Sequence, residues 1–169
     1  MCRYVTGGGG TSATSLASLP AGAEELISKP IPELENELRR VCARSRLPPS
    51  ALKTVFESYA LQTRLAAPDQ REQYQRSYLI NLIVAYRKPE LRLQSGEDKP
   101  VAELKRIFLS APLKNKNITD ETRHQMMDNL LKVYDQDTFK PEDRDFYRRM
   151  ALANLIKTNV EDPSVLDKK

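Results

Sequence analysis

The chain has 169 residues, of which 40% are hydrophobic and 30% are charged, and its net charge at pH 7 is +4. This length and composition are typical of a globular domain with a hydrophobic core. No apolar run approaches the ~18 residues that a membrane span needs, and the mild positive charge does not by itself indicate a nucleic-acid binder.

Residues 1–22 are rich in Gly, Ser, Thr and Ala. No acidic residue precedes Glu24, and Arg3 is the only basic residue before Lys29. Organelle transit peptides are poor in acids and rich in Ser, but they are also rich in Arg. Two interpretations stay open: a flexible N-terminal tail, or the remnant of an organelle-targeting segment.

Helical spacing of apolar residues predicts several helices between residues 23 and 86. A short helix is expected at 23–28. A helix at 33–46 has an apolar face of Leu34, Leu38, Val41 and Cys42. The next helix begins after Pro48-Pro49, with Ser50 as its cap, and runs to about Arg64; its inward side chains are Leu52, Val55, Phe56 and Tyr59.

Residues 68–86 are predicted to form a buried helix. Pro68 suits the first helical position, where its missing N–H costs nothing. From Tyr78 to Tyr86 the sequence is apolar nearly all round, a pattern typical of a helix in the core.

Residues 87–99 contain Pro89 and Gly96 and are expected to link this group to a second one. Pro100 opens the second group, Thr119 is a good N-cap for its middle helix, and Pro141 begins its last helix. Residues 161–169 are expected to form a C-terminal tail, broken at Pro163.

The segment 68–86 recurs as 141–159, which indicates an internal duplication. At an offset of 73 residues, eight positions are identical: Pro68/Pro141, Arg71/Arg144, Tyr74/Tyr147, Arg76/Arg149, Leu79/Leu152, Asn81/Asn154, Leu82/Leu155 and Ile83/Ile156. The sequence therefore predicts an all-α fold of two tandem three-helix units, at about 31–88 and 100–159, with six or seven helices. Together they would form one short helical-repeat, α-solenoid-like domain at 23–160.

One polar residue interrupts both copies of the repeated helix, Asn81 and Asn154. A buried amide that satisfies a neighbouring backbone group is one interpretation. The other is a recognition residue on an exposed concave face, because Tyr74 and Asn81 are seven residues apart and share a stripe, as do Tyr147 and Asn154.

Basic residues gather near the ends of the first predicted helix in each unit. They are Arg39, Arg40, Arg44, Arg46 and Lys53 in the first unit, and Lys105, Arg106, Lys114 and Lys116 in the second. Cations at helix C-termini are favoured by the helix dipole, which is sufficient reason for their presence. The alternative is contact with an anionic partner such as RNA, for which Arg39, Arg40, Arg44, Arg46, Lys105 and Arg106 are the candidates.

The two cysteines, Cys2 and Cys42, do not form a disulfide framework, and Cys42 lies on an apolar face. A reducing intracellular compartment is therefore expected. The acid-free N-terminus favours the mitochondrial matrix over the cytoplasm.

Catalytic equipment is sparse in this sequence. His124 is the only histidine, and no His/Cys cluster has metal-ligand spacing. There is no phosphate-binding glycine motif after a strand, and no nucleophile is paired with a base. We expect no enzymatic activity, no cofactor, no metal and no small-molecule substrate.

Antiparallel helix pairs with internal repetition resemble the α-solenoid class, similar to the tetratricopeptide and pentatricopeptide families. The segments 50–86 and 120–159 are each about the size of one such repeat. The chain departs from those families in lacking a glycine at the helix–helix turn and in inserting a third helix, so no RNA-reading position is carried over.

Solenoid-like arrays usually present a surface to a partner. The resemblance implies a non-catalytic interaction protein, an accessory subunit of a larger assembly, with a mitochondrial ATP synthase or ribosome as the kind of setting meant. Tyr59, Tyr74, Tyr134 and Tyr147 are the candidate contacts, because aromatics dominate interface energetics. An RNA-binding helical-repeat module is the alternative, and self-association through an apolar face is a third interpretation.

Overall fold

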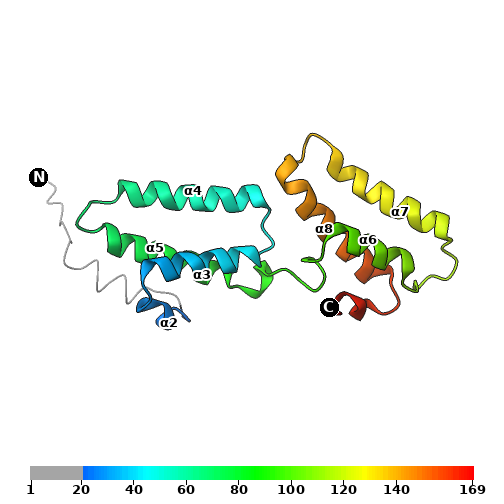
Figure 1. Ribbon diagram of the computed structural model, residues 1–169, viewed down its shortest axis with the longest axis horizontal. Coiled ribbons are helices and arrows are strands. Elements are labelled where there is room, and N and C mark those ends of the chain that lie inside the picture. Colours follow the sequence, from blue (N-terminus) through cyan, green and yellow to red (C-terminus); the bar gives the residue numbers. More distant parts are fainter. Residues whose placement is uncertain (1–20) are drawn as a thin grey trace, which may run out of the picture. The chain divides into compact units, whose positions relative to one another are not determined.

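A computed structural model describes residues 21–169 of the chain (Figure 1). The predicted N-terminal tail or targeting remnant falls almost wholly on residues 1–20, which lie outside the described residues. From 21 onward the chain is helical and contains no strand, which confirms the all-α prediction. The helices are α2 (Glu24–Ile27), α3 (Ile31–Ala43), α4 (Pro49–Leu65), α5 (Arg71–Tyr86), α6 (Val101–Ser110), α7 (Asp120–Lys132) and α8 (Pro141–Asn159), with short 3-10 turns η1 (Pro89–Leu91), η2 (Val133–Asp135) and η3 (Pro163–Leu166).

Within residues 21–169, no helix has the length and apolar character needed to cross a lipid bilayer.

The chain divides into two compact units. Unit 1 consists of the residues up to Ser45 together with Lys53–Arg92, and unit 2 consists of Arg46–Leu52 together with Leu93–Lys169. The predicted segments 31–88 and 100–159 cover most of each unit. The prediction places the short stretch 46–52 in the first unit, whereas the structure groups it with unit 2.

In unit 1 the main helix pair is α3 with α5, and α2 also packs on α5. Each of the two long helices buries one apolar face. The side chains buried there are Leu34, Leu38 and Cys42 from α3, and Leu79, Ile80 and Ile83 from α5, with Leu26 from α2. Cys42 is thus a core residue, as predicted, and burial raises the pKa of its thiol.

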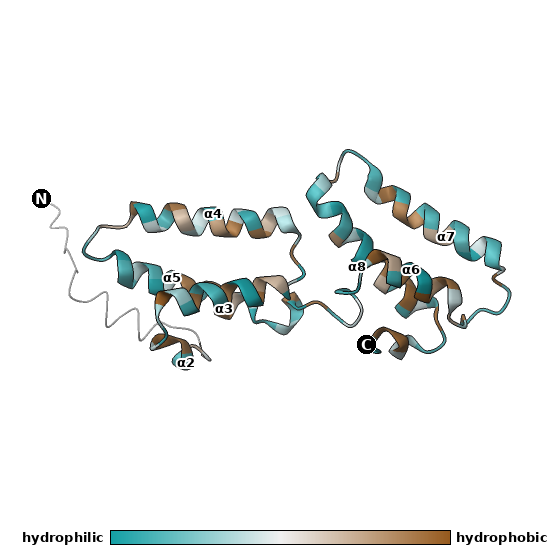
Figure 2. Cartoon of the chain, viewed as in Figure 1, coloured by the Kyte–Doolittle hydropathy of each residue, from teal (hydrophilic) through white to brown (hydrophobic). Residues whose placement is uncertain are grey.

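Helix α4 is less well buried than its two neighbours in unit 1. Only Tyr59 of its 17 residues is buried. The predicted inward residues Leu52, Val55 and Phe56 are half-buried. Polar and apolar residues alternate along α4 in Figure 2, so this helix has no single continuous apolar stripe to place against the α3–α5 pair.

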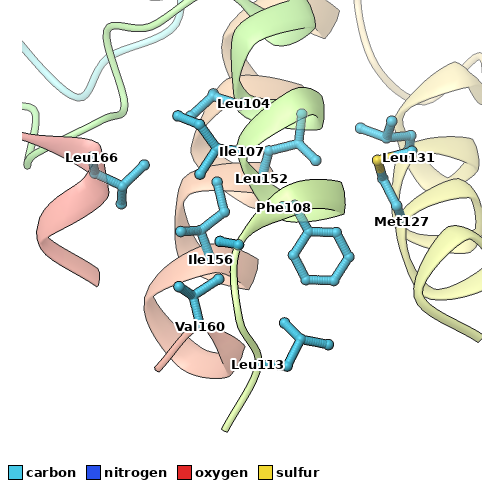
Figure 3. Close-up of a cluster of buried hydrophobic side chains, with 11 residues drawn as sticks. Leu104, Ile107, Phe108, Leu113, Met127, Leu131, Leu152, Ile156, Val160 and Leu166 are labelled. Carbon is cyan, nitrogen blue, oxygen red and sulfur yellow. The ribbon is translucent and has the colours of Figure 1, made fainter. Parts of the chain in front are cut away.

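In unit 2 the corresponding pair is α6 with α8. Figure 3 shows the core that they enclose, in which the Phe108 ring lies on the side of α6 that faces Met127 and Leu131 of α7. The remaining members of this cluster are Leu104, Ile107, Ala111, Leu113, Leu152, Ile156, Val160 and Leu166.

Several predicted helix ends are confirmed, and one is wrong. Thr119 caps α7 by accepting a hydrogen bond from the Thr122 amide at 3.1 Å, and Pro141 is the first residue of α8. Pro68, in contrast, does not begin α5, which starts at Arg71. The Gln70 amide bonds the Ala67 carbonyl at 3.0 Å, so a turn precedes the helix.

The predicted C-terminal tail instead folds back onto unit 2. Asp162 accepts a hydrogen bond from the Ser164 amide at 3.1 Å and begins η3, which buries Leu166. Leu166 packs on Gly96, where no side chain intervenes. The burial of one leucine explains why this stretch is held in place despite Pro163.

The predicted linker 87–99 is likewise partly built into the structure. Glu97 is only 3% exposed, and its carboxylate pairs with Arg46 at 3.1 Å and accepts a hydrogen bond from the Gln94 amide at 2.8 Å. A buried carboxylate requires such partners.

Candidate partner-binding surface

Tyr59 is buried, as predicted from its place on the inward side of its helix, so it does not offer an exposed ring to a partner. Its side chain is 8% exposed and points at α3 and α5. The hydroxyl donates to Glu35 Oε1 at 2.9 Å and accepts from Gln75 Nε2 at 2.5 Å. Burial raises the pKa of Tyr59 to about 12. Tyr59 is the only buried side chain of α4, and it links this helix to α3 and α5.

Tyr59 begins a stack of three tyrosine rings. Its ring centroid lies 6.0 Å from that of Tyr78, which in turn lies 6.1 Å from that of Tyr74, and the interplanar angles are 11° and 13°. Tyr74 ends the stack and is 40% exposed. Of the four predicted contact tyrosines, Tyr74 is therefore the one that presents its ring to solvent. Tyr78 was not among the candidates, although it follows Tyr74 by one helical turn.

In unit 2 the predicted tyrosines contact each other. Tyr134 and Tyr147 stack with centroids 6.1 Å apart and planes at 6°, and Phe139 packs edge-on against both at 5.1 and 5.3 Å. Both tyrosines are half-buried. This cluster joins the end of α7 to the first turns of α8, and the role of its tyrosines in partner contact stays a prediction.

Asn81 and Asn154 are both exposed, so the prediction of a buried amide is wrong. The Asn81 side chain donates to the Ser77 carbonyl of its own helix at 2.9 Å. The reason is that each helix is covered on one side only near its asparagine. In α5 the buried side chains there are Leu79 and Ile80, and in α8 they are Leu152 and Ala153. The interpretation as recognition residues stays a prediction.

The candidate residues for an anionic partner are divided between the two units. Arg39, Arg40 and Arg44 belong to unit 1, whereas Arg46, Lys105 and Arg106 belong to unit 2. Several already have partners within their unit: Arg40 pairs with Glu37 at 3.4 Å, Arg46 pairs with Glu97, and Arg39 lies over the Phe56 ring at 5.8 Å.

Arg76 and Arg149, an identical pair of the repeat, make similar contacts in their two units. Each pairs with the acid one turn earlier, Glu72 at 3.7 Å and Asp145 at 2.9 Å respectively. Each also donates to a backbone carbonyl in the segment that precedes the first long helix of its unit: Arg76 to Lys29, before α3, and Arg149 to Glu97, before α6. The sequence pairing marked these arginines but did not reveal this structural role.

A surface that the sequence did not single out lies on α4. Five large hydrophobic side chains are exposed in residues 21–169: Ile27, Leu61, Leu65, Tyr74 and Val133. Leu61 and Leu65 are 46% and 70% exposed and stand one turn apart on α4. At about 100° per residue they lie roughly 200° and 240° around the helix from Tyr59, so they face away from the core. In the sequence, the four-residue spacing of Leu61 and Leu65 and their angular distance from the inward residue Tyr59 are the signals that could have revealed this exposed side of α4.

We call the stripe formed by Thr54, Ser58, Leu61 and Leu65 the outer seam of α4; Ser58 is half-buried, and the other three side chains are exposed. Its members follow one another at intervals of four, three and four residues, so they share one side of the helix. Glu57 and Arg64 flank it and are exposed. The outer seam lies wholly within unit 1.

No group of three or more His, Cys, Asp or Glu side chains in the described part of the chain could hold a metal ion. Comparisons with protein-family models, with curated proteins and with solved structures gave no match to this chain.

Proposed function

We propose that the protein is a non-catalytic helical interaction subunit that docks on another protein through the outer seam of α4. The supporting observation is the position of Leu61 and Leu65, which lie on the side of α4 opposite its one buried residue. Burial of the outer leucines against a second surface would remove their apolar area from water, which favours docking there. Fully burying a leucine contributes about 1.5–3 kcal/mol, so two leucines are a substantial part of a binding energy.

The larger setting proposed is an accessory role in a multisubunit assembly, with a mitochondrial complex such as an ATP synthase or a ribosome as the favoured kind. The exposed ring of Tyr74 is a second candidate contact, because tyrosine is enriched among the residues that dominate interface energies.

Sedimentation of the native protein from lysate, with and without nuclease, tests this proposal. We expect fast sedimentation that survives nuclease, and mass spectrometry of that fraction would identify the partner. Sedimentation that collapses on nuclease treatment would support the RNA-binding alternative, since phosphate contacts would then hold the complex together. Sedimentation as a free 19.3-kDa chain in both cases would contradict a stable subunit role.

A matched pair of variants locates the surface. Leu65→Glu places a charge in the outer seam, and Ala60→Glu places the same charge at an exposed position of α4 outside it. We expect Leu65→Glu to release the protein from the fast-sedimenting fraction and Ala60→Glu to leave it there. Equal behaviour of the two variants would exclude the outer seam as the docking surface.

A further inference from the structure

We propose that the outer seam of α4 pairs with the same seam of a second copy of this chain, with the two helices antiparallel. This inference rests on the proposed function for the location of the surface, and it adds the identity of the partner. Three features support it: the spacing of the seam residues, the sizes of their side chains, and the charges beside them.

The spacing is that of a coiled-coil core. Thr54, Ser58, Leu61 and Leu65 occupy the alternating three- and four-residue intervals of a heptad, which place side chains along one line facing a partner helix. On the opposite side of α4, Tyr59 contacts Glu35 of α3 and Tyr78 of α5. The packing within unit 1 therefore leaves the two leucines of this line, Leu61 and Leu65, exposed and available to another helix.

The side-chain sizes favour the antiparallel direction. The first half of the seam carries the small residues Thr54 and Ser58, and the second half carries Leu61 and Leu65. In an antiparallel pair, Leu65 of one copy lies opposite Thr54 of the other, and Leu61 lies opposite Ser58. Large side chains then meet small ones in every layer, which is the arrangement that fills a helix interface well. A parallel pair would place the leucines together and leave the small residues facing each other.

The flanking charges favour the same direction. Glu57 and Arg64 lie one heptad apart on the same side of the seam. Antiparallel pairing brings Glu57 of one copy near Arg64 of the other, and the two-fold axis repeats this pair. Within its own chain Glu57 is 3.8 Å from Lys53, with both side chains more than half exposed, and such a surface pair contributes little. Glu57 is therefore able to exchange its partner.

The expected dimer is weak. One helix face of a few residues covers less surface than the interfaces of stable complexes, so association should depend on concentration in the micromolar range or above. Sedimentation-velocity centrifugation of the purified full-length chain over a concentration series measures this. We expect a shift from one copy to two copies with rising concentration, and the same shift for Ala60→Glu.

Charge exchange tests the direction of pairing. Glu57→Arg and Arg64→Glu should each weaken dimerisation about tenfold, because each places like charges together twice. The double variant Glu57→Arg/Arg64→Glu should restore the wild-type dissociation constant. Leu61→Glu should abolish the dimer while circular dichroism still shows the wild-type helix content.

The outcomes separate this inference from the proposed function. A purified chain that stays monomeric at all concentrations overturns the inference. If Leu65→Glu nevertheless releases that chain from the fast-sedimenting fraction of a lysate, the subunit role stands and the seam binds a different protein. A dimer that survives Leu61→Glu, or a double charge exchange that does not restore pairing, also overturns it. A dimer with no fast-sedimenting fraction in lysate would leave the inference standing and contradict the subunit role.

Discussion

Gly96 illustrates, at the scale of single residues, how one position can depend on having no side chain. Its φ is +84°, and a Cβ atom placed there would lie 2.6 Å from Leu166 Cδ2. Gly22 has a similar φ of +88° but no atom within 4 Å of such a Cβ. A substitution at Gly22 would therefore add backbone strain alone, whereas one at Gly96 would add both backbone strain and a steric clash with Leu166.

We predict that Gly96→Ala lowers the free energy of unfolding by about 2–4 kcal/mol, the sum of left-handed backbone strain and overpacking. Gly22→Ala should lower it by only about 1–2 kcal/mol, since strain acts alone there. Urea unfolding of the two variants measures both. Equal losses would show that the contact with Leu166 does not matter.

Asn81 leads to the opposite expectation. Because it is exposed and bonds only to a carbonyl of its own helix, Asn81→Ala should leave the protein as stable as wild type or stabilise it by up to about 0.7 kcal/mol through helix propensity. Thermal unfolding gives the comparison. A loss above about 1 kcal/mol would mean that the amide has a partner which the present structure does not show.

Tyr59 predicts a dependence of stability on alkaline pH. Burial raises its pKa in the folded chain to about 12, whereas a tyrosine in the unfolded chain titrates near 10. The unfolded state therefore loses its proton first. The contribution of Tyr59 to stability is complete below pH 10 and is lost as the pH rises towards 12.

Tyr59→Phe should flatten the fall in unfolding free energy between pH 10 and 12, and phenolate absorbance should show one fewer late-titrating group. Tyr74→Phe is the control, because its ring is exposed. Identical pH profiles for Tyr59→Phe and wild type would contradict the buried position of this hydroxyl.

At the scale of helices, α4 is the weakest element of unit 1. It buries one residue, whereas the shorter helices α3 and α5 bury three each. Local opening is easiest where few apolar contacts are lost. We predict that amides in the C-terminal half of α4 exchange with deuterium faster than those in the second half of α5. Equal protection would indicate that the outer seam is covered in solution.

Local sequence signals predicted the helices well and their surroundings poorly. Apolar spacing found α3 and α6, and Thr119 and Pro141 marked the starts of α7 and α8, because these signals act within one or two turns. Helical spacing correctly predicted that Tyr59 faces inward, but it did not decide between a buried and an exposed Asn81. Whether Asn81 is covered depends on how closely a neighbouring helix approaches, and spacing within one helix does not reveal this.

The candidate surface was missed for a related reason. The tyrosines are candidate contacts because aromatic residues often bind partners, yet the rings of Tyr134 and Tyr147 stack on each other. Leu61 and Leu65 resemble ordinary core leucines in sequence. Their exposed fractions, 46% and 70%, show that they lie on the outside of α4.

At the scale of the whole molecule, unit 2 is completed by residues from much earlier in the chain. Asp143, which is 5% exposed, accepts hydrogen bonds from the Ser50 amide at 2.8 Å and from the Ser50 hydroxyl at 2.5 Å. It thereby caps the first turn of α4 across 93 residues of sequence. The sequence suggested Ser50 as its own cap, because a partner at this separation leaves no local pattern.

We predict that Asp143→Ala lowers the free energy of unfolding by about 1–2 kcal/mol, the usual effect of losing a helix cap. It should also speed deuterium exchange at the amide of Ser50. Glu142→Ala removes an exposed acid from the same turn of α8 and should have little effect on either measurement. Similar results for both variants would show that the acidity of the α8 start, rather than the link to Ser50, is what matters.

Because Asp143 lies 93 residues after Ser50, the cap of α4 can form only late in translation. Ribosomes add about 5–20 residues per second, so Ser50 is made roughly 5–20 s before Asp143. Once Tyr86 has been added, the nascent chain contains all of α3, α4 and α5, but the start of α4 still lacks its cap until Asp143 is made. The last helix to be translated therefore fixes the beginning of a helix from the first half of the chain, and a ribosome that stalls before residue 143 leaves that beginning frayed.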